Sequence, residues 1–448
     1  MKCIEIDLNP DTSNLTLEET VELQKNTFHW YPYQRVLYLN DDSGTIFERQ
    51  CPPNTTAIEN FWTFTTREQR LQGWIACHIA ISLYLFIVLA FICDKYFLPS
   101  VERICEVLKI TPDVAASTFM ATATTTPEFF NNTISIFIAD SDMGLGAVVG
   151  SMLFNTLGVA ASAAMFTKKP IQIDWWPITR DSILFSINLS ILVIFAWDGV
   201  IMWWETCILV TLYVDPPMKR ERRKSFDLSR IDEVDEEEFK IWEIPRGVGW
   251  FDIFWYFFTW PIRFILYYTI PNPITQKKWF AASFVICILW IGIVAYIIFW
   301  MVVIIGDTFG IPDAIMGFTL LAFGGCMPEA ISAVIVARKG SGQMGVSNAL
   351  GANNLAVLFS LGLPWFIRTM VDGAGFNDAF IQIYSFGIEF TIMTLILAVA
   401  CLYATIAIAG YKLRKTVGGF LAIFYIIFAT FAILVELEFF LSPSERCP

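Results

Sequence analysis

The chain is organised in long apolar blocks that short polar connections separate. A helix needs about 20 mostly apolar residues to cross a bilayer, so the blocks predict an all-α polytopic membrane protein with about ten transmembrane helices. The blocks 182–197 and 200–214 are short and nearly touch, so they form a tight hairpin or one of them is incomplete. The expected spans are 72–94, 114–138, 143–166, 182–197, 200–214, 279–305, 314–336, 343–366, 379–409 and 416–441.

Composition agrees with this membrane interpretation. Hydrophobic residues make up 56% of the chain and charged residues 16%, whereas soluble domains average about 45–50% and about 25%. We therefore expect the chain to lie in a lipid bilayer and to have no nucleic-acid partner. An enzyme is not indicated, because the only histidines are His29 and His78 and no nucleophile–base pair or His-rich metal motif is present. No catalytic residue and no cofactor is predicted.

Basic residues fall in alternate loops, and the remaining loops between spans hold only Arg368. The positive-inside rule places the basic loops in the cytoplasm, which requires an even number of spans with both termini extracellular or lumenal. Residues 1–71 would then form an outer N-terminal segment and 442–448 an outer tail. The basic loops include Lys95, Arg103, Lys109, Lys168, Lys169, Arg180, Lys219, Arg220, Arg222, Arg223, Lys224, Arg338, Lys339, Lys412, Arg414 and Lys415.

A cytoplasmic loop of residues 215–278 is expected between two membrane domains. A basic cluster at 219–224 runs into an acidic tract, which favours a solvated linker whose basic end meets anionic lipid. The alternative is regulatory: phosphorylation of Ser225, which follows three basic residues, would cancel part of that attraction.

The aromatic segment 250–270 within this loop is long enough to span a membrane. Asp252, Pro261 and Arg263 interrupt it, and an added span would place every later basic loop outside. We therefore expect the segment at the inner membrane interface.

The outer side carries candidate modification sites. Asn14 and Asn54 each begin a glycosylation sequon. Cys51 and Cys447 would share the oxidising side, so a disulfide between them and two free thiols are both open.

Two apolar stretches each contain a Pro-Glu dipeptide, which places Glu128 and Glu329 well inside their spans. In both cases a glycine-led apolar stretch, beginning at Gly150 or Gly351, starts 22 residues later. A charge near the bilayer midplane is costly, so such carboxylates indicate function rather than packing. The first Pro-Glu span runs from inside to outside and the second from outside to inside, which predicts an inverted repeat of two five-helix halves and alternating access.

Proline before each glutamate removes a backbone donor and frees a carbonyl one turn earlier. The preceding Thr124 and Thr125, or Gly324 and Gly325, make a broken helix easy. Carbonyls, hydroxyls and carboxylates are hard oxygen ligands that suit Ca²⁺ and Na⁺.

At these residues the chain resembles the sodium/calcium exchangers of the cation/Ca²⁺ exchanger superfamily, most of all the potassium-dependent branch. Residues 119–128 and 150–155 are similar to its first α-repeat, here 114–166, and residues 317–329, 336–340 and 362–366 to its second, here 314–366. The resemblance implies exchanger membrane domains at 72–214 and 279–441, which exchange Na⁺ for Ca²⁺. Similar motifs outside the repeats lie at 51–53, 93–97, 175–177, 180–182 and 203–205.

We expect the transported cations to be bound by carboxylates, amides and hydroxyls of the two repeats. Asn155 keeps its family position, although a buried structural hydrogen bond is the alternative role for it. The expected ligands are Glu128, Glu329, Asn155, Thr124, Thr125, Asn353 and Asn354.

The chain departs from the family pattern mainly in the second repeat. The usual Gly-Thr-Ser becomes Gly324-Gly325-Cys326, which removes two hydroxyls and leaves a soft sulfur, and Glu329 replaces an aspartate. Ala356 stands where the potassium-dependent branch has an aspartate associated with K⁺. Two carboxylates balance one Ca²⁺, but an added K⁺ would be uncompensated in a low dielectric. We therefore expect reduced or absent K⁺ dependence.

Three functions are compatible with these residues. The first is Ca²⁺/Na⁺ exchange that contributes to calcium homeostasis. The second is exchange with different coupling, for example of Ca²⁺ for H⁺, and the third is a non-transporting regulatory homologue. The resemblance and the sequons favour the plasma membrane, and an organelle membrane fits the same topology.

Overall fold

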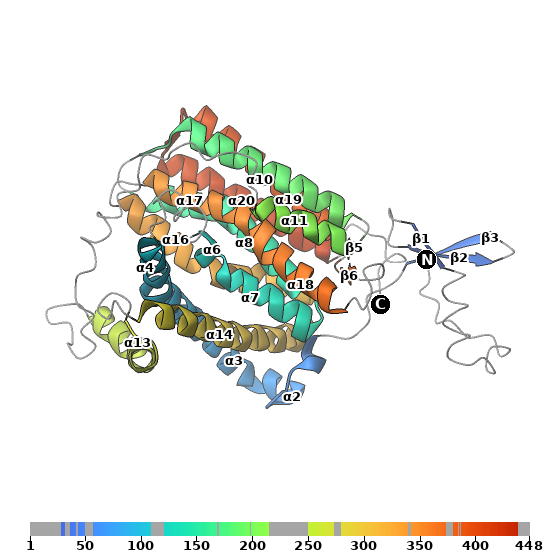
Figure 1. The fold of residues 1–448 in the computed structure, drawn as a ribbon, viewed down its shortest axis with the longest axis horizontal. Helices are drawn as coiled ribbons and strands as arrows, with labels where there is room; N and C mark the ends of the chain where they lie inside the picture. The colour runs from blue at the N-terminus through green and yellow to red at the C-terminus, as the bar shows by residue number, and fades with distance from the viewer. Residues whose placement is uncertain are drawn as a thin grey trace.

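The fold is a bundle of membrane-length helices, as the computed structural model in Figure 1 shows. Asn14, Asn54, Cys51, Ser225 and Cys447 lie outside the described residues, so their predicted modifications stay predictions. The structure describes residues 28–31, 36–41, 44–49, 57–108, 121–167, 170–197, 199–214, 250–272, 279–338, 342–372, 380–383, 385 and 387–437.

The first half of the bundle precedes the long loop. Several of its helices contain π-helical turns, labelled η, that join straighter α-helical pieces. In chain order the helices are η2 (Ala57–Asn60), α2 (Arg67–Gln69), η3 (Arg70–Trp74), α3 (Ile75–Ile92), η4 (Cys93–Phe97), α4 (Leu98–Val107), α6 (Ala121–Thr124), α7 (Thr126–Ile134), η6 (Ser135–Ala139), α8 (Met143–Leu153), η7 (Phe154–Gly158), α9 (Val159–Phe166), α10 (Trp175–Ala196) and α11 (Trp203–Val214); of these, η2 is a 3₁₀ turn.

The second half repeats much of this pattern, with a π-helical turn in each of two kinked helices. Its helices are α13 (Trp250–Thr269), α14 (Phe280–Phe309), α15 (Asp313–Met316), η8 (Gly317–Leu321), α16 (Ala322–Arg338), α17 (Gly342–Leu355), η9 (Ala356–Leu361), α18 (Gly362–Asp372), α19 (Ile388–Ile408) and α20 (Lys415–Glu436).

Three small antiparallel sheets accompany the helices. β1 (Phe28–Tyr31), β2 (Val36–Asp41) and β3 (Gly44–Arg49) form one sheet, which the sequence did not lead us to expect. β4 (Ile171–Gln172) pairs with β7 (Lys412–Leu413), and β5 (Val200–Met202) pairs with β6 (Phe380–Gln382). The last two sheets join loops of one half to loops of the other.

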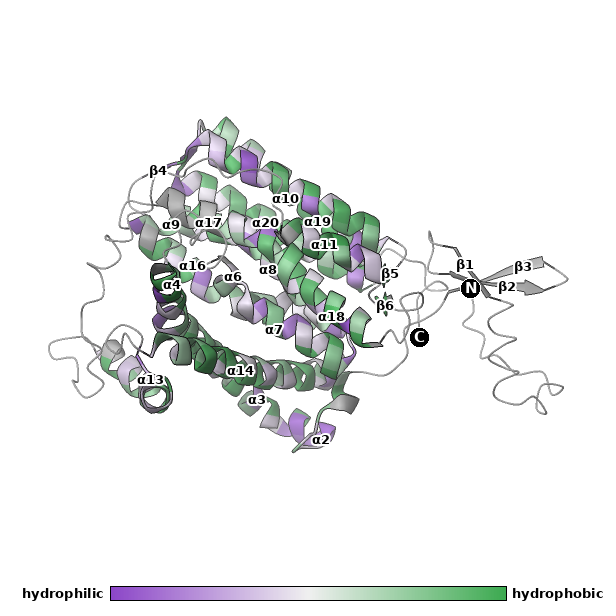
Figure 2. Ribbon diagram, in the orientation of Figure 1, coloured by the Kyte–Doolittle hydropathy of each residue, from purple (hydrophilic) through white to green (hydrophobic). Residues whose placement is uncertain are grey.

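Eight helices of the described chain are long and apolar enough to cross a membrane, so the all-α polytopic fold is confirmed. Of the other two expected spans, the first Pro-Glu span is interrupted at Thr125, and α11 is a shorter apolar helix. The count of ten stays a prediction. Large apolar side chains such as Ile194 (70% exposed) and Ile426 (61%) lie on the outside of the bundle, as lipid contact requires. Figure 2 shows the same helices in hydrophobic colours.

Two expected spans have different bounds. α10 begins at Trp175 rather than 182 because Arg180 and Asp181 form a buried ion pair, with Arg180 Nη2 2.8 Å from Asp181 Oδ1, which lets both charges enter the helix. α19 begins at Ile388 rather than 379 because residues 380–382 form strand β6.

The aromatic segment expected at the inner interface forms helix α13. Figure 1 shows α13 nearly end-on, beside one end of the bundle. Its Tyr256 and Leu266 are buried, whereas Trp250, Phe257 and Tyr268 are exposed. The Phe258 ring packs edge-on against the Tyr84 ring of α3, with 5.1 Å between the ring centroids. An interfacial location fits this orientation and stays a prediction.

Two apolar cores hold the bundle together. One is built mainly by α8 to α11 with α16 to α20, and the other by α3, η4 and α14. α14 packs along α3, and Arg70 Nη2 forms an ion pair with Asp307 Oδ2 at 2.6 Å that joins the ends of these two helices.

Glycines allow α8 to cross the α15–η8 segment at close range. A Cβ at Gly146 would overlap the Ala314 carbonyl, and one at Gly317 would overlap the Met143 carbonyl. Membrane helices that lack a hydrophobic driving force between them use such small residues for close backbone contact. The crossing brings η7, which carries Asn155, close to α16, which carries Glu329.

This crossing predicts that Gly317→Ala destabilises the protein. The added methyl group must displace the Met143 backbone, which costs about 1–3 kcal/mol of unfolding free energy. The measurement is the melting temperature of the purified protein in detergent. Gly419→Ala in α20, where a Cβ meets nothing within 4 Å, is the control and leaves the melting temperature unchanged or higher. Equal melting temperatures for both variants would contradict the account.

Candidate ion-binding site

The helix that carries Glu128 is broken immediately before it. α6 ends at Thr124 and α7 begins at Thr126, and Thr125 between them has φ −89° and ψ 2°. Pro127 lies in the first turn of α7, where its missing N–H breaks no helical hydrogen bond. The hydroxyls of Thr125 and Thr126 donate to the Thr122 carbonyl at 3.1 and 3.0 Å. Backbone and side-chain oxygens are therefore concentrated one turn before Glu128.

A corresponding break beside Glu329 was also predicted, and this prediction is wrong. α16 runs without interruption from Ala322 through Pro328 to Arg338, and the irregular turn is η8, further toward the N-terminus. A local π-helical adjustment is one way in which membrane helices tolerate proline. Gly324 serves packing instead, because a Cβ there would overlap the Phe86 ring.

The two glutamates face a common region in the bundle. Glu128 is 5% exposed and Glu329 is half-buried, and the Glu329 carboxyl group lies within electrostatic reach of Glu128. Within the described part of the chain, Oε2 of each glutamate has no hydrogen-bond partner. Figure 2 shows hydrophilic residues on α7 among hydrophobic helices. Two nearby carboxylates in apolar surroundings repel each other unless a cation lies between them or one of them is protonated.

Asn155 completes this group from the π-helical turn η7. Its side chain is a hydrogen-bonding neighbour of the Glu329 carboxylate. It is 4% exposed, and its Oδ1 accepts no hydrogen bond from any described residue. Of the predicted ligands, Glu128, Glu329 and Asn155 are therefore brought together.

Asn353 and Asn354 make structural contacts. Asn353 Nδ2 donates to Thr156 Oγ1 at 2.9 Å and to the Met152 carbonyl at 3.2 Å, which joins α17 to the α8–η7 segment. Asn354 points toward α10, where its Oδ1 accepts from Asn188 Nδ2 at 3.0 Å. Asn353 Oδ1 is buried without a partner among described residues and stays a candidate ligand, whereas Asn354 already serves the α10–α17 contact.

Ser360 and Asn132 belong to the site's support, and sequence reasoning missed both. Ser360 Oγ donates to the Thr125 carbonyl at 3.1 Å, and Asn132 Nδ2 donates to the Ser360 carbonyl at 2.7 Å. These bonds join the break before Glu128 to η9. Buried polar residues in an apolar span were the available signal for both.

The positions where the resemblance implies lost ligands are apolar or open. Ala356, the first residue of η9, is buried in the larger apolar core. A Cβ at Gly325 would meet nothing within 4 Å, so space remains where the family pattern has a side chain. Cys326 is fully buried, and its Sγ lies 3.8 Å from the Ser151 carbonyl.

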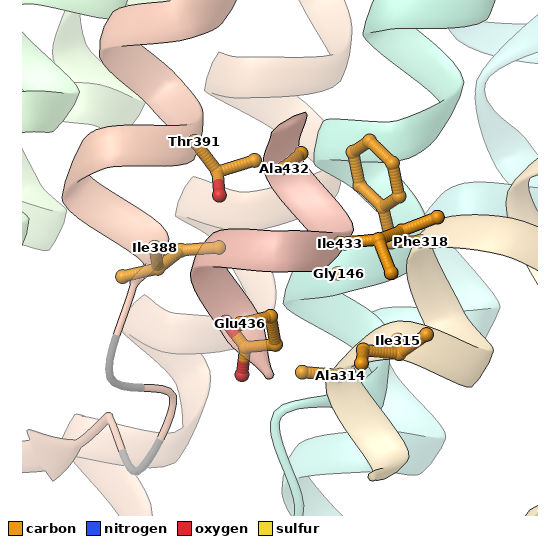
Figure 3. A pocket seen from close by; sticks show the side chains of 9 residues that line it. All are labelled: Gly146, Ala314, Ile315, Phe318, Ile388, Thr391, Ala432, Ile433 and Glu436. Carbon is orange, nitrogen blue, oxygen red and sulfur yellow. The ribbon is translucent and has the colours of Figure 1, made fainter. Parts of the chain in front are cut away.

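No group of three or more His, Cys, Asp and Glu side chains within the described ranges is arranged to hold a metal ion. The surface cavity in Figure 3 is a separate feature between α8, α15, η8, α19 and α20. Glu436 is the one charged residue among its nine lining residues. The cavity does not include either glutamate of a Pro-Glu dipeptide.

A helical membrane bundle with paired intramembrane carboxylates defines the protein as a membrane transporter of ions rather than an enzyme. The model of the sodium/calcium exchanger protein family matches residues 78–214 and 279–434, so the chain belongs to that family.

The chain is also similar to individual known proteins. The chain is 27% identical to sodium/potassium/calcium exchanger 4 of Homo sapiens, over 89% of this chain and 87% of the relative. It is 29% identical to sodium/potassium/calcium exchanger 5 of Homo sapiens, over 84% and 86%. A solved structure of the sodium-calcium exchanger NCX_Mj soaked with Na⁺ and Sr²⁺ covers 79% of this chain and 97% of its own, with 18% identity and a TM-score of 0.47.

The Ser360 contact predicts that Ser360→Ala lowers both stability and transport. The loss of one interhelical hydrogen bond costs about 0.6 kcal/mol of unfolding free energy in membrane proteins, and the Thr125 carbonyl becomes less well positioned. Melting temperature and Ca²⁺ uptake measure the two effects. Ser162→Ala, which removes a hydroxyl bonded within α9 to the Val159 carbonyl, is the matched control. A larger effect of Ser162→Ala would refute the positioning role.

Proposed function

We propose that this protein is a secondary antiporter that exchanges Ca²⁺ for Na⁺ by alternating access and contributes to calcium homeostasis. The observation that carries the proposal is the pairing of Glu128 and Glu329 from opposite halves of the chain, with unpartnered carboxylate oxygens among the described residues. Two carboxylates neutralise one Ca²⁺, and the Asn155 oxygen adds a neutral ligand. Thr124, Thr125 and Asn353 are the further candidate ligands.

Alternating access requires two halves of opposite orientation, and the pairing of elements supports such an inverted repeat. α3 packs on α14 and α10 packs on α19, so each pair contains one helix from each half. The π-helical turns η7 and η9 follow the equivalent helices α8 and α17, which contain Gly150 and Gly351. If the loops are numbered by the expected span that they follow, sheet β4–β7 joins loop 3 to loop 9, and sheet β5–β6 joins loop 4 to loop 8. An inverted repeat exchanges loop 3 with loop 8 and loop 4 with loop 9. The exchange therefore turns one of these sheets into the other, as two equivalent halves require.

We propose further that Ca²⁺ transport does not require K⁺. Ala356 supplies no charge, and its side chain is enclosed by the apolar core. A monovalent cation beside Ca²⁺ would leave one positive charge uncompensated at low dielectric, which is unfavourable by several kcal/mol. Both termini outside, on the basis of the basic-residue pattern, are part of this proposal. A plasma-membrane location is part of it too, on the basis of the family resemblance and the two glycosylation sequons.

Exchange of Ca²⁺ for H⁺ is the second candidate. The Thr125 and Thr126 hydroxyls both donate to the Thr122 carbonyl, and Gly325 brings no hydroxyl. The second repeat therefore supplies fewer hydroxyls than the family pattern, and carboxylates bind protons as well as Na⁺.

Uptake of ⁴⁵Ca²⁺ into liposomes under imposed gradients tests the proposal. We expect uptake driven by an outward Na⁺ gradient and abolished by Glu128→Gln and by Glu329→Gln, because each change removes half of the charge that balances Ca²⁺. Uptake driven only by a pH gradient would establish the second candidate instead. No uptake under any gradient, with protein that elutes as a folded species, would refute both.

Ala356→Asp is expected to confer K⁺ dependence on this uptake. The new carboxylate lies four residues before Ser360 and provides the charge that a K⁺ ion needs. Initial uptake rates at fixed voltage, with and without K⁺, measure the change. The isosteric Ala356→Asn carries no charge and is the control. Strong K⁺ stimulation of the unaltered protein, or of Ala356→Asn, would contradict the charge argument.

A further inference from the structure

The segment before α3, residues 57–74, folds back onto the end of α14. Phe61 is buried, and its ring centroid lies 6.0 Å from that of Phe299 in α14. Trp300 Nε1, also in α14, donates a hydrogen bond to the Trp62 carbonyl at 2.9 Å. Together with the ion pair described above between the ends of α3 and α14, these aromatic contacts attach the segment firmly to α14.

The same segment also reaches both Pro-Glu spans, at one end of the bundle. Its first turn, η2, packs against η6, which follows the helix that carries Glu128. The Ala57 N–H donates a hydrogen bond to Asp313 Oδ2 at 3.2 Å, and Asp313 is the first residue of α15, where the span that carries Glu329 begins. Among the described residues, this bond is the one hydrogen bond between the segment and α15. The segment is therefore held by many contacts on α14 and by few on the Glu329 span.

The turn between α14 and α15 has the features of a hinge. Gly310 has φ +67°, the left-handed conformation that favours glycine, and its N–H donates to the Asp307 carbonyl at 3.3 Å. Pro312 follows and precedes α15 with φ −54° and ψ 143°. Hinges are a few residues at the ends of elements that absorb changes in backbone angles. A change in the angle between α14 and α15 at this turn would break the bond between Ala57 and Asp313 but leave the aromatic contacts on α14 intact.

We propose that residues 57–74 form a latch, in which the hydrogen bond between Ala57 and Asp313 opens and closes during transport while the rest of the segment stays on α14. The closed latch, which the structure shows, fixes the start of the Glu329 span relative to α14. Asp313 and Glu329 lie on one kinked span, so a movement of this span that changes access to Glu329 also moves Asp313. Asp313 is thus a positioning residue and not a cation ligand. The proposal rests on the proposed function, because alternating access requires such a movement.

Reversible cross-linking of Ala57→Cys with Asp313→Cys in the full-length protein tests the latch. A short bifunctional methanethiosulfonate joins the two thiols, and a reducing agent releases them. We expect the cross-link to lower ⁴⁵Ca²⁺ uptake to the level of empty liposomes and reduction to restore it. The Ca²⁺-induced rise in melting temperature should remain, because the cross-link leaves Glu128 and Glu329 unaltered. Cross-linked protein that keeps its uptake, or that loses the Ca²⁺ effect as well, would overturn the latch.

Phe64→Cys with Trp300→Cys is the matched control pair, because these two rings pack with 5.3 Å between their centroids and join the same segment to α14. The latch keeps these two positions together throughout transport, so this cross-link should leave uptake unchanged. Each single-cysteine variant controls for the native cysteines and should show the same uptake before and after treatment. A block of uptake in the control pair, or in a treated single variant, would refute the latch.

Ala57→Pro tests the same bond if the paired variant fails to fold. Proline lacks the N–H and is tolerated at the first position of a helix, whereas Ala57→Val also enlarges the side chain but keeps the N–H. Uptake should be faster for Ala57→Pro than for Ala57→Val, because the bond that must break in each cycle is absent. Equal or slower uptake would overturn the latch.

The rate of cross-linking separates the latch from the proposed function. If the unaltered protein takes up no ⁴⁵Ca²⁺ under any gradient, the proposed function fails, and the rate at which the thiols at positions 57 and 313 are joined decides the latch. We expect saturating Ca²⁺ to change this rate, because a cation bound at Glu329 alters the position of its span. Equal rates with and without Ca²⁺ would then refute the latch as well.

Discussion

The repulsion between Glu128 and Glu329 is the constraint on which the rest of the structure depends. Two carboxylates enclosed by apolar helices lose most of their solvation energy, and because they carry the same charge, they cannot compensate each other for this loss. Neighbouring side chains leave one oxygen of each without a partner among the described residues. In the proposed function a bound cation would turn this repulsion into two attractions, so we expect cation binding to stabilise the folded protein.

The bundle holds these charges together with contacts that do not involve them. Glycines bring α8 close to α15 and η8, which places Asn155 beside Glu329. Ser360 fixes the break before Glu128 from the opposite half, and Asn353 fixes the start of η7. Each of these bonds joins an element of one half to an element of the other. The site therefore depends on how the two halves are packed, which is the property that an alternating-access transporter must change.

The long apolar blocks were sufficient to predict the membrane fold. The two Pro-Glu dipeptides were sufficient to predict that Glu128 and Glu329 lie inside the helical bundle. The start of α10 could not be predicted, because the buried pairing of Arg180 with Asp181 is visible only in three dimensions. The same limit applies to Asn354, which points toward Asn188 in α10. The uninterrupted α16 was missed because Pro328 and two glycines suggested a break, whereas Gly324 is needed for close packing against Phe86. Short strands such as β6 carry too little pattern to be distinguished from the end of an apolar span.

The central claim is that Glu128 and Glu329 together form one divalent-cation site, and thermal unfolding with added Ca²⁺ tests it most directly. A ligand that binds only the folded protein stabilises it by about 2.7 kcal/mol at 100 times its dissociation constant. The account predicts that Ca²⁺ raises the melting temperature of the purified protein, that Mg²⁺ does so far less, and that either Glu128→Gln or Glu329→Gln removes the Ca²⁺ effect. An equal Ca²⁺-induced rise in the unaltered protein and in both variants would contradict it.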